Sequence, residues 1–133
     1  MGTVTLPRHI LKTIATHAKE GHPNEVCGIL AGKDFASCRI LRATNTEQSP
    51  VSYFMDPKEQ LRFHKEMREQ GEKMLAIYHS HPGSEAFPSQ KDVDLAFYPD
   101  TLSIIISLLQ DPPVIRAFSI NEGKIEELFI QSL

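Results

Sequence analysis

The sequence contains little cysteine and no long apolar segment. Only Cys27 and Cys38 occur among its 133 residues. Two cysteines are too few for a disulfide framework and are typical of a reducing compartment. The longest apolar stretch, residues 102–109, carries two serines and is far too short to span a bilayer. The N-terminus lacks the apolar core and cleavage site of a signal peptide. We therefore expect a cytoplasmic protein without a membrane partner.

An excess of positive charge is also missing. The chain has 14 Lys and Arg against 17 Asp and Glu, for a formal net charge of −3, and no run of basic residues. Proteins that bind nucleic acid by neutralising phosphates need such an excess, so nucleic acid is not an expected partner. The length is sufficient to bury a core and predicts one domain over residues 1–133. A homodimer and a monomer both stay open.

The apolar pattern predicts an α/β fold with a mixed sheet flanked by helices. Ile10, Leu11, Ile14 and Ala18 recur at helical spacing, and this helix is expected to end at Gly21. Asp56 and Pro57 are typical of a helix start. The helices are expected over residues 7–21, 57–70 and 89–97, and the strands over residues 25–32, 38–43, 52–55, 74–81, 102–108, 114–120 and 125–130.

The segment HSHPGSEAFPSQKD, residues 79–92, carries the most chemistry. Residues two apart on a strand point to the same face, so His79 and His81 are expected to aim at one point where their strand ends. Asp92 follows at the start of the next expected helix. Two imidazoles and a carboxylate form a three-ligand set suited to catalytic zinc, with a fourth position left open.

Each of these residues also has a structural interpretation. Histidines at a strand end are often only hydrogen-bonded, and Ser89 with Asp92 forms a capping-box pattern that can start a helix without catalysis. Asp94 competes with Asp92 as the third ligand. Residues two apart on a helix point in roughly opposite directions, so only one of them can face the histidines. We choose Asp92, because its place in the first turn keeps it near the loop. Glu85 is a weaker competitor on the loop.

A hydrolytic site also needs a proton acceptor, and Glu25 is the candidate. It begins an apolar, glycine-containing strand. Charged residues are seldom buried, so a glutamate at the edge of a buried apolar segment suggests a specific role. The alternative is that a glutamate at a strand terminus simply faces solvent.

Glu25, within PNEVCGILAG, together with HSHPGSEAFPSQKD, resembles the JAMM or MPN-plus metallopeptidases of the Mov34/PAD-1 superfamily. Their pattern is Glu, then His-x-His, seven residues, Ser, two residues and Asp. This chain is similar at all five positions: Glu25, His79, His81, Ser89 and Asp92. The resemblance covers nearly the whole chain.

The resemblance implies the MPN fold, a curved mixed sheet with helices related to the cytidine deaminases. It implies that His79, His81 and Asp92 bind Zn²⁺, that Glu25 is the general base, and that Ser89 helps to hold the developing oxyanion. Deamination itself is not expected, because the Pro-Cys-x-x-Cys signature of that chemistry is missing from the sequence.

Among members of that superfamily, the chain looks most like the stand-alone prokaryotic type. This similarity implies cleavage of a peptide or isopeptide bond after the C-terminal Gly-Gly of a ubiquitin-like or sulfur-carrier protein. One alternative is a non-catalytic MPN-type interaction module, as in members that have lost ligand residues, which this chain keeps. Another is a zinc hydrolase of cell-wall peptides, a type that is usually exported or fused to other domains.

Overall fold

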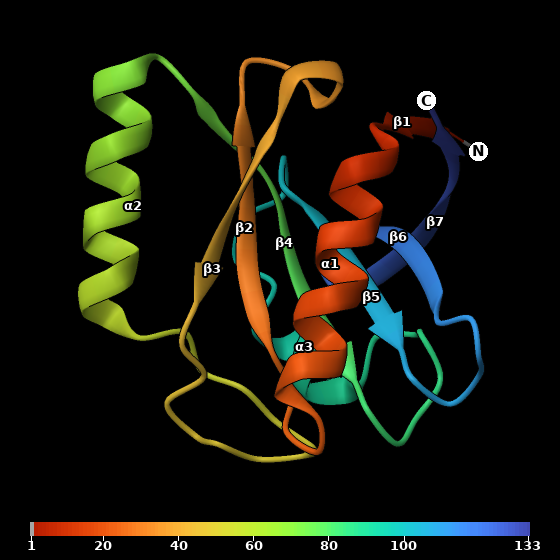
Figure 1. Cartoon of the computed structure of the whole chain (residues 1–133). Coiled ribbons are helices and arrows are strands. Elements are labelled where there is room, and N and C mark those ends of the chain that lie inside the picture. Colours follow the sequence, from red (N-terminus) through yellow and green to blue (C-terminus); the bar gives the residue numbers. More distant parts are fainter. Residues whose placement is uncertain (1) are drawn as a thin grey trace.

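The computed structural model describes residues 2–133, and its strands form one seven-stranded sheet (Figure 1). The strand order is β1-β7-β6-β5-β4-β2-β3. β4 pairs antiparallel with β2 and parallel with β5, so the predicted mixed sheet is confirmed. The strands are β1 (Thr3–Leu6), β2 (Cys27–Gly32), β3 (Arg39–Ala43), β4 (Lys73–His81), β5 (Leu102–Ser107), β6 (Val114–Asn121) and β7 (Lys124–Ser132).

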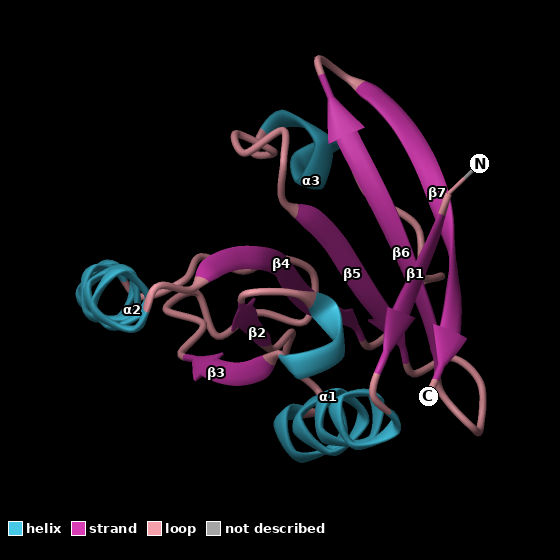
Figure 2. Ribbon diagram, turned by 90° about the horizontal axis from the view of Figure 1, so that it is seen from above, coloured by secondary structure: helices cyan, strands magenta, loops and turns pink. Residues whose placement is uncertain are grey.

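The helices lie on different sides of this curved sheet. Viewed from above in Figure 2, α1 (Arg8–Gly21) covers one face, α3 (Gln90–Asp94) lies on the opposite side, and α2 (Pro57–Gln70) lies beside β2, β3 and β4. A short 3₁₀ turn, η1 (Phe35–Ser37), links β2 to β3. None of the helices within residues 2–133 has the length and apolar character needed to cross a membrane.

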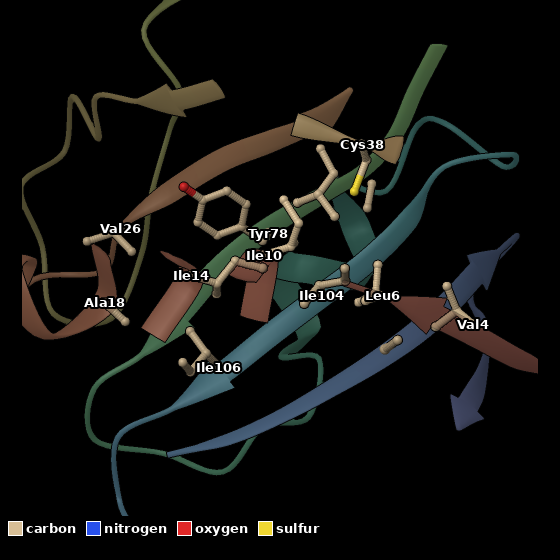
Figure 3. Close-up of a cluster of buried hydrophobic side chains, with 13 residues drawn as sticks. Val4, Leu6, Ile10, Ile14, Ala18, Val26, Cys38, Tyr78, Ile104 and Ile106 are labelled. Carbon is tan, nitrogen blue, oxygen red and sulfur yellow. The ribbon is translucent and has the colours of Figure 1, made fainter. Parts of the chain in front are cut away.

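The central strand β4 separates two layers of packing. Ala76 and Tyr78 join the core beneath α1, which includes Ile14 and Ile104 (Figure 3). Ile77, on the other face, packs against the cluster under α2. Because neighbouring strand residues alternate between faces, His79 and His81 lie on the Ile77 side, away from α1.

One glycine is required by the packing of this core. A Cβ atom at Gly28 would lie 2.4 Å from the Tyr78 ring. Only glycine lets the β2 backbone approach the ring so closely. Tyr78 is then fully buried, and its hydroxyl lies 2.6 Å from His17 Nδ1 on α1.

Two expectations about the elements are wrong, and one strand was missed. Residues 52–55 do not form a strand, apart from an isolated bridge between Met55 and Asn45. The Asn45 side chain takes the hydrogen bonds that a neighbouring strand would make: its Nδ2 donates to Ser52 O and its Oδ1 accepts from Phe54 N. The helix expected to reach residue 97 ends at Asp94. β1 was not predicted, because four residues directly before a helix carry too short a pattern.

β6 and β7 form a hairpin. Asn121 pairs with Lys124, and the two residues between them, Glu122 and Gly123, have φ angles of 50° and 79°. Two positive φ angles are the requirement of the tight turn that matches the twist of paired strands.

Candidate metal centre

His79 and His81, the last same-facing residues of β4, converge on one point. Their Nε2 atoms lie 3.1 Å apart, and their rings are almost completely buried. The pairing of β4 with β2 on one side and β5 on the other fixes the direction of both side chains. The sequence expectation of two imidazoles aimed at one point is met.

Asp92 reaches the same point from the first turn of α3. Its Oδ2 lies 3.2 Å from Nε2 of each histidine. The capping box is also present: Asp92 N donates to Ser89 Oγ, and Ser89 N donates to Asp92 Oδ2. The two interpretations of Ser89 and Asp92 are therefore compatible, because the helix cap aims the carboxylate at the histidines. Asp94 is exposed and accepts a hydrogen bond from Gln90 instead.

The spacing of the three groups fits a tetrahedral metal ion. One ligand atom from each residue lies within 4.8 Å of the others. An ion about 2.0–2.1 Å from each ligand in tetrahedral geometry separates the ligand atoms by about 3.3 Å. The Nε2 and Oδ2 atoms are 3.1–3.2 Å apart. Two imidazoles and a carboxylate in this arrangement are able to hold a divalent metal.

The two imidazoles are oriented by different contacts. His81 Nδ1 lies 2.8 Å from the carbonyl oxygen of Glu85 and donates to it, which leaves Nε2 free to act as a ligand. The His79 ring stacks on Tyr53, with centroids 4.7 Å apart. Glu85, weighed from the sequence as a competing ligand, thus contributes its backbone. Neither contact is signalled by the sequence, because both partners lie on irregular loops.

Mutual proximity perturbs the ionisation of the triad. Burial opposes the charge on Asp92, but hydrogen bonds from His79 and His81 outweigh it and hold the pKa of Asp92 far below its usual range. Burial lowers the pKa of His81, but the Asp92 carboxylate and the Glu85 carbonyl outweigh it, so the pKa of His81 is raised. Protonation of His81 is therefore favoured in the metal-free site and competes with metal binding.

Glu25 lies beside the triad. It directly precedes β2, whereas the sequence predicted that it begins this strand. Cys27 pairs antiparallel with His79. Continuing that register by two residues brings Glu25 opposite His81, on the same face. Only 6% of Glu25 is exposed, so the alternative of a solvent-facing glutamate is excluded.

Three hydrogen bonds fix the backbone around Glu25. Its N–H donates to Ser49 O, its carbonyl accepts from Asn45 Nδ2, and the next N–H, of Val26, donates to Ser80 Oγ. Ser80 is fully buried on the α1 side of β4, between the two histidines. Sequence reasoning missed Ser80 and Asn45. A polar residue between two candidate ligands in a buried strand is the signal that could have found Ser80.

The Glu25 carboxylate is suited to exchanging protons near neutral pH. Burial is the largest cause that raises the pKa of Glu25, His81 and Lys91 lower it and Asp92 raises it, and the net pKa is about 7. Glu25, His81 and Ser89 line one cleft, whose outer wall includes His22. Because Ser89 Oγ accepts the helix-capping bond, its hydroxyl proton remains available for donation into this cleft.

A second groove, with both polar and apolar walls, also borders the triad. His79 and Asp92 lie in its wall. The remaining wall combines polar residues such as Lys91 with apolar and aromatic ones that include Tyr53, Ile77, Leu95, Phe97 and Tyr98. Leu95, Phe97 and Tyr98 are about half exposed or more. The triad therefore borders both a cleft that contains a titratable carboxylate and a groove with partly aromatic walls.

The fold and the site together define a metallopeptidase-type α/β domain. The family described as prokaryotic homologs of the JAB domain matches residues 7–121. The chain belongs to this family, and the resemblance seen in the sequence is confirmed. A JAB1/MPN domain protein from Archaeoglobus fulgidus has a TM-score of 0.68 over all of both chains at 21% identity. This likeness confirms the predicted MPN fold.

Curated relatives carry names of enzymes. The chain is 37% identical over 122 residues to the CysO-cysteine peptidase of Mycobacterium tuberculosis, covering 89% of this chain and 83% of that protein. It is 31% identical over 120 residues to a Thermus thermophilus protein named "Probable TtuB-protein conjugate cleaving protease", covering 90% of this chain and 77% of that protein. The chain is accordingly an enzyme of the JAMM peptidase class.

We expect the triad to bind a metal ion with an affinity that decreases at acidic pH. With Zn²⁺ as the probe, we expect about one ion per chain at pH 7.5, measured by competition with a chromophoric chelator. Protonation of His81, with its raised pKa, must compete with the metal, so affinity should already fall as the pH decreases toward about 6.5, the ordinary pKa of histidine.

Matched aspartate variants test which carboxylate takes part. Asp92→Ala should lose most of the Zn²⁺ affinity, whereas Asp94→Ala, two residues further along the same helix, should bind as the parent does. Equal binding by both variants would contradict the assignment of Asp92.

Proposed function

We propose that this chain is a zinc-dependent peptidase in which Glu25 acts as the general base. The proposal is carried by one observation: the buried Glu25 carboxylate shares a cleft with His81 and Ser89, and burial raises its pKa to about 7. A base that exchanges protons near its own pKa is most effective near that pH. His79, His81 and Asp92 are the proposed ligands, and two nitrogens with one oxygen form a donor set that suits zinc.

The proposed catalytic role of each group follows from its position in the site. Zn²⁺ held by the three ligands would act as a Lewis acid that polarises the substrate carbonyl and lowers the pKa of water. Glu25 accepts a proton from the attacking water and passes it to the leaving nitrogen as the carbon–nitrogen bond breaks. The Ser89 hydroxyl donates to the oxygen on which negative charge develops. The Glu85 carbonyl keeps His81 in one tautomer throughout.

The proposed substrate is the C-terminal tail of a ubiquitin-like or sulfur-carrier protein joined to an amine. The names of the two relatives, a CysO-cysteine peptidase and a TtuB-protein conjugate cleaving protease, support this class. The two hollows beside the triad support a direction for the chain. The leaving nitrogen must approach Glu25, so the acyl side extends toward the groove of Tyr53 and Leu95.

Glu25→Gln separates catalysis from metal binding. The amide keeps the shape of the side chain but cannot accept the proton, so cleavage should fall by 10²-fold or more while Zn²⁺ binding persists. The assay is incubation of the zinc-loaded protein with sulfur-carrier proteins bearing a C-terminal extension, followed by mass spectrometry. In the parent enzyme, activity should decrease as acid protonates Glu25. A bound cation favours the carboxylate, so this decrease should lie at or below about pH 7.

An active Glu25→Gln enzyme would remove Glu25 as the base. Zinc binding without cleavage of any such fusion, by the parent or the variant, would favour the non-catalytic interaction module.

Ser89→Ala tests the oxyanion role. Loss of one donor to the developing charge should lower kcat by about 10²–10³-fold. The change also removes the cap of α3, a loss of about 1 kcal/mol of stability that thermal unfolding measures separately. Ser89→Thr keeps both the hydroxyl and the cap and should restore most of the rate. A Ser89→Ala enzyme with unchanged kcat would restrict Ser89 to its structural role.

A further inference from the structure

The Glu85 carbonyl that orients His81 belongs to the loop between β4 and α3. A backbone carbonyl cannot be held by a side chain of its own, so its position depends on how the loop is anchored. Glu85 itself is exposed, and its carbonyl lies 2.8 Å from His81 Nδ1. Two side-chain anchors flank it closely, one at Ser84 and one at Phe87, and the backbone N–H of Phe87 also donates to the Glu85 carbonyl over 2.8 Å.

The first anchor is Ser107, at the end of β5. β5 runs parallel to β4, and Ser107 pairs directly with His81. The Ser107 hydroxyl is buried and donates to the Ser84 carbonyl over 2.6 Å, while it accepts from Leu109 N at 3.2 Å. The residue just before Glu85 is therefore tied to the same part of the sheet that carries His81.

The second anchor is the Phe87 ring. It packs edge-to-face on Phe118, with centroids 5.4 Å apart and an angle of 80°. The Arg116 guanidinium lies 5.8 Å from the Phe87 ring and 5.3 Å from the Phe118 ring. Arg116 is itself held by two hydrogen bonds to Glu127. Phe118 is fully buried, so the ring on the loop is docked on a rigid part of β6.

We propose that Phe87 and Ser107 are positioning residues that hold the Glu85 carbonyl against His81 and thereby set the metal affinity of the triad. The role of His81 as a ligand rests on the function proposed above. With the carbonyl in place, the Nδ1 atom of neutral His81 carries the proton and Nε2 keeps its lone pair for the metal. Loosening the carbonyl lets the ring change tautomer and rotate. Partners of ligating histidines typically contribute 10–100-fold in metal affinity.

Two readouts test the proposal on the full chain. Long-range ¹H–¹⁵N NMR of the metal-free protein reports which His81 nitrogen carries the proton when the ring is neutral, and chelator competition reports Zn²⁺ affinity. Phe87→Ala should mix the tautomers and weaken Zn²⁺ binding about tenfold or more. Ser107→Ala, which acts from the other side of Glu85, should do the same. Phe87→Tyr keeps the ring and should restore both values.

Phe129→Ala is the matched control. It deletes the same ring from an exposed position on β7, 68% accessible, and should leave the tautomer and the affinity unchanged. The proposal is overturned if Phe87→Ala and Ser107→Ala both keep the parent tautomer and affinity. A parent protein that binds no Zn²⁺ would instead contradict the proposed function, and the tautomer would still decide whether Phe87 and Ser107 position the carbonyl.

Discussion

The Asp92 carboxylate, shared between two imidazole nitrogens 3.2 Å away, is the contact on which the rest of the site depends. It joins the end of a central strand to the start of a helix that is only five residues long. Such a short helix has little stability of its own. The capping bonds with Ser89 and the contacts with His79 and His81 therefore place α3, and α3 in turn places the carboxylate. Structure and candidate chemistry rely on the same few atoms.

The alternation of β4 divides support from function. Tyr78 and Ser80 point toward α1, where Tyr78 fills the core and Ser80 accepts the hydrogen bond that ties down Val26. His79 and His81 point the other way, into the site. Ser80, which holds the backbone next to Glu25, and the histidines of the site thus come from opposite faces of the same strand. The two strands beside β4 position the remaining residues. Glu25 directly precedes β2, and the anchor Ser107 ends β5.

Local pattern was enough to predict the parts of the site that depend on periodicity. The same-facing histidines follow from the two-residue repeat of a strand, and the choice of Asp92 follows from its place in the first turn of the helix and from the spacing of the family pattern. The stacking of Tyr53 on His79 and the use of the Glu85 carbonyl depend on how loops fold back, which no short pattern encodes. Residues 52–55 read as a strand for the same reason: their propensity is local, whereas the Asn45 amide that binds their backbone lies seven or more residues away.

Three residues are proposed to bind zinc, and a fourth, Glu25, is proposed to stay free to move protons. The most direct measurement is a crystal structure of the zinc-loaded protein with anomalous data at the zinc edge. We expect one peak within about 2.2 Å of His79 Nε2, His81 Nε2 and an Asp92 oxygen, with the Glu25 carboxylate outside bonding distance of the ion. A peak bound jointly by the Glu25 and Asp92 carboxylates would make Glu25 a ligand and would contradict its role as the base.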